Sequence, residues 1–140
     1  MIALDTNLLI YAHRGAAPEH PAARRVIDEA SSRDRWGLSL ACVGEFYSVV
    51  THSSTPQPST ARQASDFIEG LLEGGAEIWM PGPGFATRLI RLAELRNIRG
   101  PRIFDLQIAL TAFEGGATEL WSHDRNFVTV PGLPVVDPLA

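Results

Sequence analysis

The chain begins Met1-Ile2-Ala3-Leu4-Asp5-Thr6-Asn7, and this stretch by itself indicates the fold class. Residues 2–4 are apolar and are followed at once by three residue types that favour the N-cap of a helix. We therefore predict a buried strand over 2–4 that leads directly into a helix from Leu8 to about His13. A buried strand joined to a helix is the unit from which parallel sheets are built.

Outside this opening, short apolar runs alternate with longer segments of helical period along the chain. The predicted strands cover residues 36–40, 77–80 and 119–122, with an edge strand at 134–136. The predicted helices cover residues 18–33, 42–52, 59–73, 85–95 and 102–114, with Gly and Pro signals between them. This alternation predicts an α/β fold in a single domain over residues 1–140, with three α/β/α layers and a four- to five-stranded, mostly parallel sheet.

The composition excludes several functional classes. The chain has 140 residues, of which 45% are hydrophobic and 20% charged, and this is typical of one globular domain. No segment approaches the ~18–20 apolar residues of a membrane span and an acid interrupts the N-terminal apolar run, so we expect a cytoplasmic protein with no membrane contact. All 12 basic residues are arginine, which excludes chemistry that needs a P-loop or Schiff-base lysine. The net charge of −4 argues against nucleic-acid binding through overall positive charge but allows a local arginine patch.

The cysteine and histidine content argues against soft-metal chemistry. Cys42 is the only cysteine, so an intrachain disulfide and a cysteine-based zinc site are both excluded. None of the four histidines lies four residues from another, as a helical zinc site would require. A metal site in this chain would therefore have to use oxygen ligands.

Acidic residues occur at or just after the predicted strands, or in the first turns of the helices that follow. They are Asp5, Glu45, Asp105 and Asp124. In open parallel sheets this edge is where ligands bind. Each acid also has a structural explanation when it is considered alone. Asp5 fits an N-cap, Glu45 an exposed acid near a helix N-terminus, and Asp124 a solvated turn.

Asp105 gives the strongest single indication of a site. Its neighbours on one helical face are Ile108, Ala109 and Ala112, whereas the polar residues of that helix point the opposite way. An acid in an apolar stripe needs a metal, a buried arginine or a capping role. Several carboxylates at one sheet edge repel each other unless a cation neutralises them, so together they predict a Mg²⁺ or Mn²⁺ pocket suited to phosphodiester hydrolysis.

Four motifs in this order carry a resemblance to a known family. They are Leu4-Asp5-Thr6-Asn7, Gly44-Glu45-Phe46, Phe104-Asp105-Leu106-Gln107-Ile108-Ala109 and Ser122-His123-Asp124-Arg125-Asn126-Phe127. Over essentially its whole length the chain resembles the PIN-domain ribonucleases, and more closely the VapC toxins of type II toxin–antitoxin systems.

The resemblance implies roles for individual residues. It makes Asp5, Glu45, Asp105 and Asp124 the acidic catalytic pocket, with Asp5 and Asp105 as direct ligands of Mg²⁺, for which Mn²⁺ is a possible substitute. Thr6, Asn7 and Asn126 would support the pocket. Asn126 stands where many relatives carry a further acid, and Phe104 stands where a polar residue is common. We therefore expect one metal and leave a second open.

The resemblance also implies an activity and partners. A metal-bound water would attack an RNA phosphodiester and leave a 5′-phosphate. Arg14, Arg102 and Arg125 would contact the RNA, although each also fits a solvated or ion-paired surface residue. A VapB-like antitoxin would insert a cation into the pocket from an apolar groove, and a homodimer is expected. Two helical faces could line that groove, or could simply pack in the core. They contain Phe46, Val50, Phe67 and Leu71.

Two other readings remain open for the same chain. In the first, the protein has lost catalysis and serves only as the binding partner of a repressor-type antitoxin. In the second, the pocket belongs to a metal-dependent DNA nuclease or phosphatase, because its chemistry recognises phosphate esters rather than the sugar.

Overall fold

The strand at the N-terminus, β1 (Ile2–Leu4), forms the centre of a five-stranded sheet in a computed structural model that describes residues 1–33 and 35–140. It pairs in parallel with β2 (Trp36–Ser39) on one side and with β4 (Glu119–Trp121) on the other. The outer strands are β3 (Glu77–Trp79) and β5 (Val135–Val136), which gives the order β3-β2-β1-β4-β5. The predicted parallel sheet and its fifth strand at one edge are confirmed.

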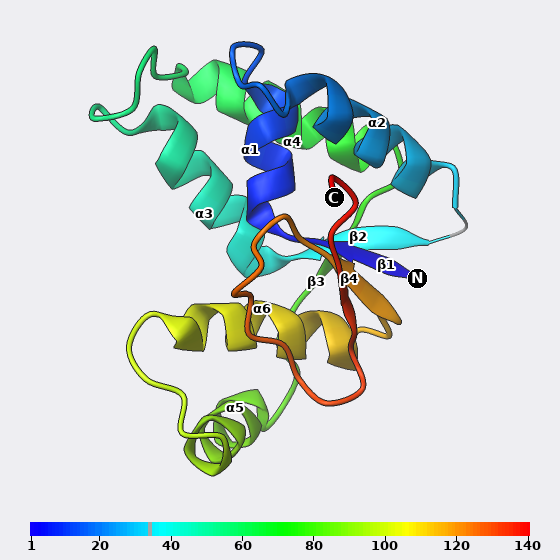
Figure 1. Cartoon of the computed structure of the whole chain (residues 1–140), viewed down its shortest axis with the longest axis vertical. Helices are drawn as coiled ribbons and strands as arrows, with labels where there is room; N and C mark the ends of the chain where they lie inside the picture. The colour runs from blue at the N-terminus through cyan, green and yellow to red at the C-terminus, as the bar shows by residue number, and fades with distance from the viewer. Residues whose placement is uncertain (34) are drawn as a thin grey trace.

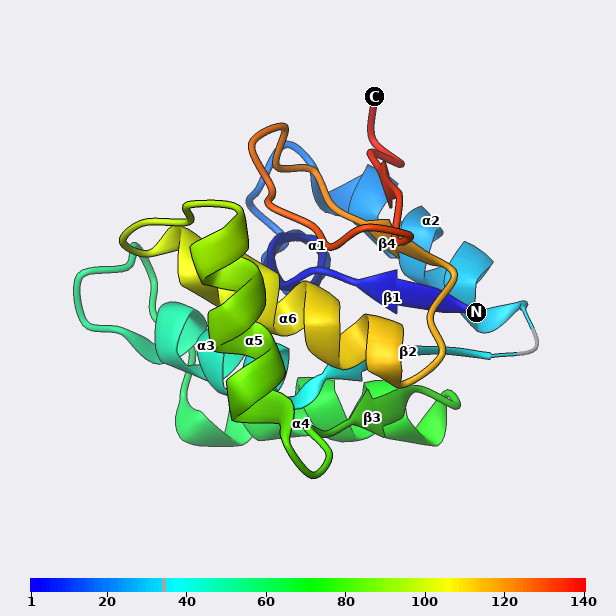
Figure 2. The same ribbon diagram turned by 90° about the horizontal axis from the view of Figure 1, so that it is seen from below.

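Helices cover both faces of the sheet and confirm the three-layer prediction. They are α1 (Thr6–His13), α2 (His20–Ser31), α3 (Leu40–Thr51), α4 (Ala61–Glu73), α5 (Phe85–Leu95) and α6 (Arg102–Glu114). Figure 1 shows α1, α2 and α4 on one side of the strands and α5 and α6 on the other. Figure 2 shows the second layer from below, with α5 and α6 in front of the sheet. The carboxyl end of β1 points toward α3 and the start of α6 (Figure 1).

Most helix boundaries differ from the predictions by one or two residues, and the reason is visible at α1. The helix begins at Thr6 rather than at Leu8, because Asp5 itself is the N-cap and accepts a hydrogen bond from the Thr6 amide at 2.7 Å. At α4 a capping box between Thr60 and Gln63 similarly sets the start. The boundaries of α6 match the prediction, because Gly and Pro residues flank it.

The predicted polar arc of α6 is wrong in one respect. Thr111 is buried, with 3% of its surface exposed, and its hydroxyl donates to the Gln107 carbonyl at 2.7 Å. The helix contacts α3, α5 and β2, and Thr111 lies on a covered side of it, whereas Phe104 and Phe113 are exposed. A threonine inside a helix satisfies its hydroxyl in this way without a partner from another element.

The core contains aromatic side chains from the strands. All three tryptophans are buried and pack in the core. Phe46 and Val50 are also fully buried, and Phe46 stacks on Phe67 with ring centroids 5.0 Å apart. Of the two alternatives left open for these faces, core packing is therefore the one that applies to Phe46 and Val50. Cys42 is a free, buried thiol.

At Gly37, the backbones of β2 and β3 lie too close for a side chain between them. A Cβ at this position would collide with the backbone carbonyl of Glu77 on β3. Only glycine therefore allows β2 and β3 to pair in the observed register, in which Gly37 lies opposite Glu77. Among the described residues no helix is both long and apolar enough to cross a membrane.

Candidate active site

Asp5 is the most buried acid of the candidate site. It follows β1 directly and caps α1, and only 7% of its surface is exposed. Its Oδ1 accepts the bond from the Thr6 amide, and its Oδ2 accepts a bond from the Ser122 hydroxyl at 2.8 Å. Burial raises the pKa of Asp5 from 3.8 to about 6, against the lowering effect of these two hydrogen bonds, and the charges of Asp105 and Glu45 add to the increase. The charge of Asp5 is thus costly in the folded protein.

Ser122 connects three parts of the site. Its hydroxyl donates to Asp5 and accepts from the Asp124 amide at 3.1 Å and from the Asn7 side-chain amide at 3.4 Å. Asn7 also accepts a bond from the His123 amide through its side-chain oxygen, at 3.4 Å. The segment after β4 is therefore held against the start of α1, although about 115 residues separate the two in sequence.

Asp105 lies in the first turn of α6 and is partly buried. Its Oδ2 accepts a hydrogen bond from the Val128 amide at 3.3 Å. Burial raises the pKa of Asp105, the bond from Val128 opposes this, and the charges of Asp124 and Glu45 raise the pKa further. The nearby charge of Arg102 has a smaller lowering effect.

Glu45 and Asp124 complete the acidic group from the surface. Glu45 is exposed on α3, and its charge raises the pKa of both Asp5 and Asp105. Asp124 is exposed in the loop after β4, where its Oδ1 accepts a bond from the Asn126 amide at 2.9 Å. The structure therefore brings the other three predicted acids within electrostatic range of Asp105, with two of the four acids partly or fully buried and two exposed.

The oxygen atoms at this edge suit a hard divalent cation held by few protein ligands. In the part of the chain that the structure describes, no three His, Cys, Asp or Glu side chains are grouped closely enough to hold one metal ion together. Mg²⁺ commonly binds through one or two carboxylates and keeps several waters, so this arrangement fits it better than an all-protein cage. Asp5 and Asp105 are the two partly or fully buried carboxylates and have the raised pKa values that a nearby cation would offset.

The other predicted site residues lie at different distances from the acids. Thr6 contributes through its backbone amide, since its buried hydroxyl has no hydrogen-bond partner among the described residues. The Asn126 carbonyl accepts from Arg102 at 3.5 Å, which places Arg102 beside the acidic group. Arg125 is exposed on the same loop. Arg14 lies at the far end of α1 and donates to the Val49 carbonyl at 3.3 Å.

Comparison with known proteins agrees with this geometry. The sequence pattern of the PIN domain matches residues 2–133. The chain belongs to the PIN-domain family. It is 31% identical over 130 residues to the VapC ribonuclease Mb2897 of Mycobacterium bovis, an alignment that covers 91% of this chain and 88% of the relative. The predicted resemblance to PIN domains of the VapC type is thereby confirmed.

Solved structures support the fold of this PIN domain. The VapBC2 complex of Rickettsia felis bound to a promoter DNA fragment matches with a TM-score of 0.69 at 20% identity, over 97% of this chain and 98% of that one. VapC20 of Mycobacterium tuberculosis, described as a Sarcin-Ricin loop cleaving toxin, matches with a TM-score of 0.69 at 14% identity, over 91% and 92%. At these identities the matches establish the fold alone.

Two contributors to the site of this PIN domain were not predicted from the sequence. The first is Ser122, although a small hydroxyl residue directly after a strand and two residues before an acid was a usable signal. The second is the pair of His123 and Asp137, whose Nδ1 and carboxylate oxygens lie 3.0 Å apart. It ties the loop after β4 to the segment after β5, and nothing local in the sequence indicated it.

Proposed function

We propose that this PIN domain is a Mg²⁺-dependent endoribonuclease toxin of a type II toxin–antitoxin system. The observation that carries the proposal is the group of four acids at one sheet edge, in which Asp5 has a pKa raised to about 6 by burial and by the charges of its neighbours. The domain type and the similarity to a protein named VapC ribonuclease support the same activity.

In the proposed site, Asp5 and Asp105 would hold the metal, with the exposed Glu45 and Asp124 beside them. Bound Mg²⁺, or Mn²⁺ in its place, offsets phosphate charge and lowers the pKa of a coordinated water. Asp5 is fixed by Thr6 and Ser122, so its geometry is set before substrate arrives. The exposed carboxylates of Glu45 and Asp124 accept hydrogen bonds from the attacking water and orient it toward the phosphodiester. The cut leaves a 5′-phosphate.

RNA reaches this acidic edge through arginines at its rim. Arg102 lies next to Asp105 and Asn126, and Arg125 lies on the loop that carries Asp124. Both are exposed and suited to phosphate contacts that compensate the repulsion between RNA and the acids. Because its proposed substrate is cellular RNA, we assign the protein to the cytoplasm.

The proposed partner is a small VapB-like antitoxin that directs an Arg or Lys side chain into the acidic group. A dense negative site binds a cation strongly through charge-assisted hydrogen bonds. The structural match to the VapBC2 complex supports this type of partner. We also propose a homodimer, for which α3, α5 and α6 offer exposed apolar side chains. They include Tyr47, Val49, Ile90, Leu95 and Phe104.

The experiment is metal-dependent cleavage of total RNA followed by sequencing of the new 5′ ends. Cleavage is expected with Mg²⁺ or Mn²⁺ and is expected to stop in EDTA and in the variants Asp5→Asn and Asp105→Asn. The matched control is Asp28→Asn, which changes an exposed acid on α2 and should cleave normally. Direct ligation of the products without prior phosphorylation tests for the 5′-phosphate.

Four outcomes would contradict the proposal. Undiminished cleavage in EDTA would exclude metal dependence, and full activity of both pocket variants would move the chemistry elsewhere. Cleavage of DNA or of phosphate monoesters in preference to RNA would favour the nuclease or phosphatase alternative. Overexpression that is harmless, together with no RNA cleavage, would favour a binding module without catalysis.

A further inference from the structure

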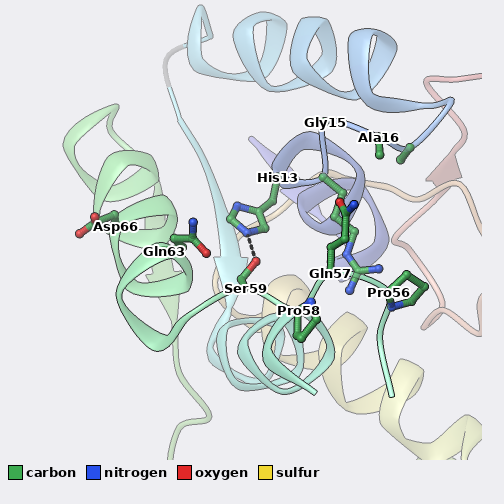
Figure 3. Close-up of a pocket in the computed structure, with 11 residues that line it drawn as sticks. His13, Gly15, Ala16, Pro56, Gln57, Pro58, Ser59, Gln63 and Asp66 are labelled. Carbon is green, nitrogen blue, oxygen red and sulfur yellow. Dashed lines mark hydrogen bonds between the residues drawn. The ribbon is translucent and has the colours of Figure 1, made fainter. Parts of the chain in front are cut away.

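A second feature lies at the opposite end of α1 from the acidic group. A cavity of about 950 Å³ opens between the end of α1, the loop from α3 to α4 and the start of α4 (Figure 3). Ligand sites commonly have volumes of about 300–1,000 Å³, so this one is large enough for a nucleotide. The residues that define it are His13, Arg14, Pro56, Gln57, Pro58 and Ser59.

The wall of this cavity is fixed before any ligand binds. His13 Nε2 and Ser59 Oγ are 2.8 Å apart, as the dashed line in Figure 3 shows. The His13 ring packs edge-on against Phe46 and Phe67, with centroid distances of 5.3 and 5.1 Å. The Ser59 amide also donates to the Val50 carbonyl at 2.8 Å, which anchors the loop to α3.

Gln57 is held in an unusual conformation at the mouth of the cavity. Its φ of 51° lies in the left-handed region that favours glycine, and prolines stand on both sides of it. A non-glycine residue in that region costs about 1–2 kcal/mol, so the loop maintains Gln57 there at the expense of stability. Its side chain is drawn toward the cavity beside Pro56 and Pro58 in Figure 3.

Arg14 supplies the positive charge of the cavity. Its guanidinium makes one hydrogen bond, to the Val49 carbonyl, and forms no ion pair with any described residue. Burial, with the charges of Arg14 and His20, lowers the pKa of His13, so the imidazole is neutral at neutral pH and offers hydrogen bonding without charge. Asp66 also lines the cavity, but its carboxylate is 3.7 Å from Arg62 and is compensated there.

The acidic group and the cavity lie at opposite ends of α1, and α3 packs against that helix. Asn7 lies in the first turn of α1 and Arg14 is its C-cap, seven residues further on, at a separation of about 10 Å along the helix axis. On α3, Val49, whose carbonyl binds Arg14, lies one turn beyond Glu45. A single RNA strand positioned at the acids would therefore reach the cavity within a few nucleotides.

We infer that this cavity binds one unstacked nucleotide of single-stranded RNA, with its phosphate against Arg14 and its base against Gln57 and the His13–Ser59 pair. The inference rests on the proposed ribonuclease function and gives it a recognition subsite away from the cut. Hydrogen bonding to splayed bases is how proteins read single-stranded RNA. A docked peptide helix would instead need a continuous apolar stripe, whereas this lining places Arg14, Gln57 and Ser59 among its prolines and alanines.

The first experiment measures RNA binding by the full chain carrying Asp5→Asn, so that no cleavage occurs. The probes are fluorescent single-stranded homopolymers of adenylate, uridylate and cytidylate, titrated at several salt concentrations. Adding Arg14→Gln should reduce the slope of log affinity against log salt by about 0.7, the contribution of one phosphate contact to a single strand. Arg91→Gln, a change at an exposed arginine on α5, is the matched control and should leave the slope unaltered.

Gln57→Gly tests the base contact without endangering the fold, because glycine accepts the left-handed backbone. It should weaken binding about fivefold, the loss of one hydrogen bond, with no change in salt slope. A series of RNA substrates shortened from their ends tests the subsite in the protein that keeps Asp5. Its cleavage rate should fall abruptly at the length that no longer reaches the cavity, and the Arg14→Gln variant should show no abrupt fall at that length.

The outcomes separate the inference from the function on which it rests. A parent protein that cleaves no RNA contradicts the proposed function, whatever the binding data show. Cleavage by the parent, with equal salt slopes for Arg14→Gln and Arg91→Gln and unchanged affinity in Gln57→Gly, overturns the subsite alone. Loss of antitoxin co-purification in these variants with RNA binding intact assigns the cavity to the protein partner and also overturns it.

Discussion

Replacing Asp5 with asparagine should stabilise the metal-free protein at neutral pH while abolishing its activity. Burial and the charges of Asp105 and Glu45 raise the pKa of Asp5 from 3.8 to about 6. A folded-state pKa above the unfolded value means that the folded protein binds the proton more tightly, so ionised Asp5 lowers the free energy of unfolding above pH 6. The difference corresponds to about 3 kcal/mol.

Part of this gain is lost in the asparagine variant. In the parent, Asp5 Oδ2 accepts a hydrogen bond from the Ser122 hydroxyl, and the Ser122 oxygen itself accepts two further hydrogen bonds. In the variant, an amide nitrogen at the position of Oδ2 would compete with those two donors for the Ser122 oxygen. A rearranged hydrogen bond costs about 1 kcal/mol, which leaves a net gain of about 2 kcal/mol. For a domain of this size the melting temperature should rise by about 7 °C.

The assay is urea and thermal unfolding of the parent, Asp5→Asn and the control Asp28→Asn in EDTA, across a pH series. The advantage of Asp5→Asn should be complete above the raised pKa of about 6 and should disappear as pH falls through that value toward 3.8, because the parent then becomes protonated. Titrating groups that do not interact with Asp5 cancel in the difference, whereas the coupled carboxylates Asp105 and Glu45 contribute to it in the same direction. Mg²⁺ should raise the melting temperature of the parent and not of Asp5→Asn.

An Asp5→Asn variant that is less stable than the parent at neutral pH in EDTA would refute this prediction. A stability difference between the two proteins that does not change with pH would refute it as well. Either result would mean that the charge of Asp5 is well accommodated at the N-terminus of α1, where a negative charge contributes about 0.3–1 kcal/mol and asparagine keeps only the cap.

Three further predictions concern the site and the sheet. Asp105→Asn and Glu45→Gln should both abolish RNA cleavage. In thermal melts without metal, Asp105→Asn should be at least as stable as the parent, because the pKa of Asp105 is also raised. Ser122→Ala should lower the free energy of unfolding in urea by about 1–3 kcal/mol. It should also raise the pKa of Asp5 further, because the lost hydrogen bond from Ser122 lowers that pKa, and activity should then need higher pH. Gly37→Ala should cost about 3 kcal/mol through collision with β3, whereas Gly44→Ala, which meets open space on α3, should be neutral or stabilising.

The order and type of the helices and strands could be predicted from the sequence because their signals are local. The apolar run at 2–4 and the acid that follows it indicate a buried strand and a capped helix. Flanking Gly and Pro residues set both ends of α6. Parallel pairing of the first four strands followed from the helices between them, and the position of Asp105 in an apolar stripe followed from the helical period.

The composition of the site depended on contacts that no local pattern encodes. The sheet order places β4 beside β1, and only this brings the Ser122 hydroxyl to Asp5 across 117 positions of sequence. The same order joins His123 to Asp137 and brings the exposed Glu45 within electrostatic range of two carboxylates. Helical and strand periods report which face of an element is buried, whereas pairing between distant elements is decided by the packing of the whole chain. The acids were therefore recognisable in the sequence, but the residues that hold them and the raised pKa of Asp5 required the tertiary structure.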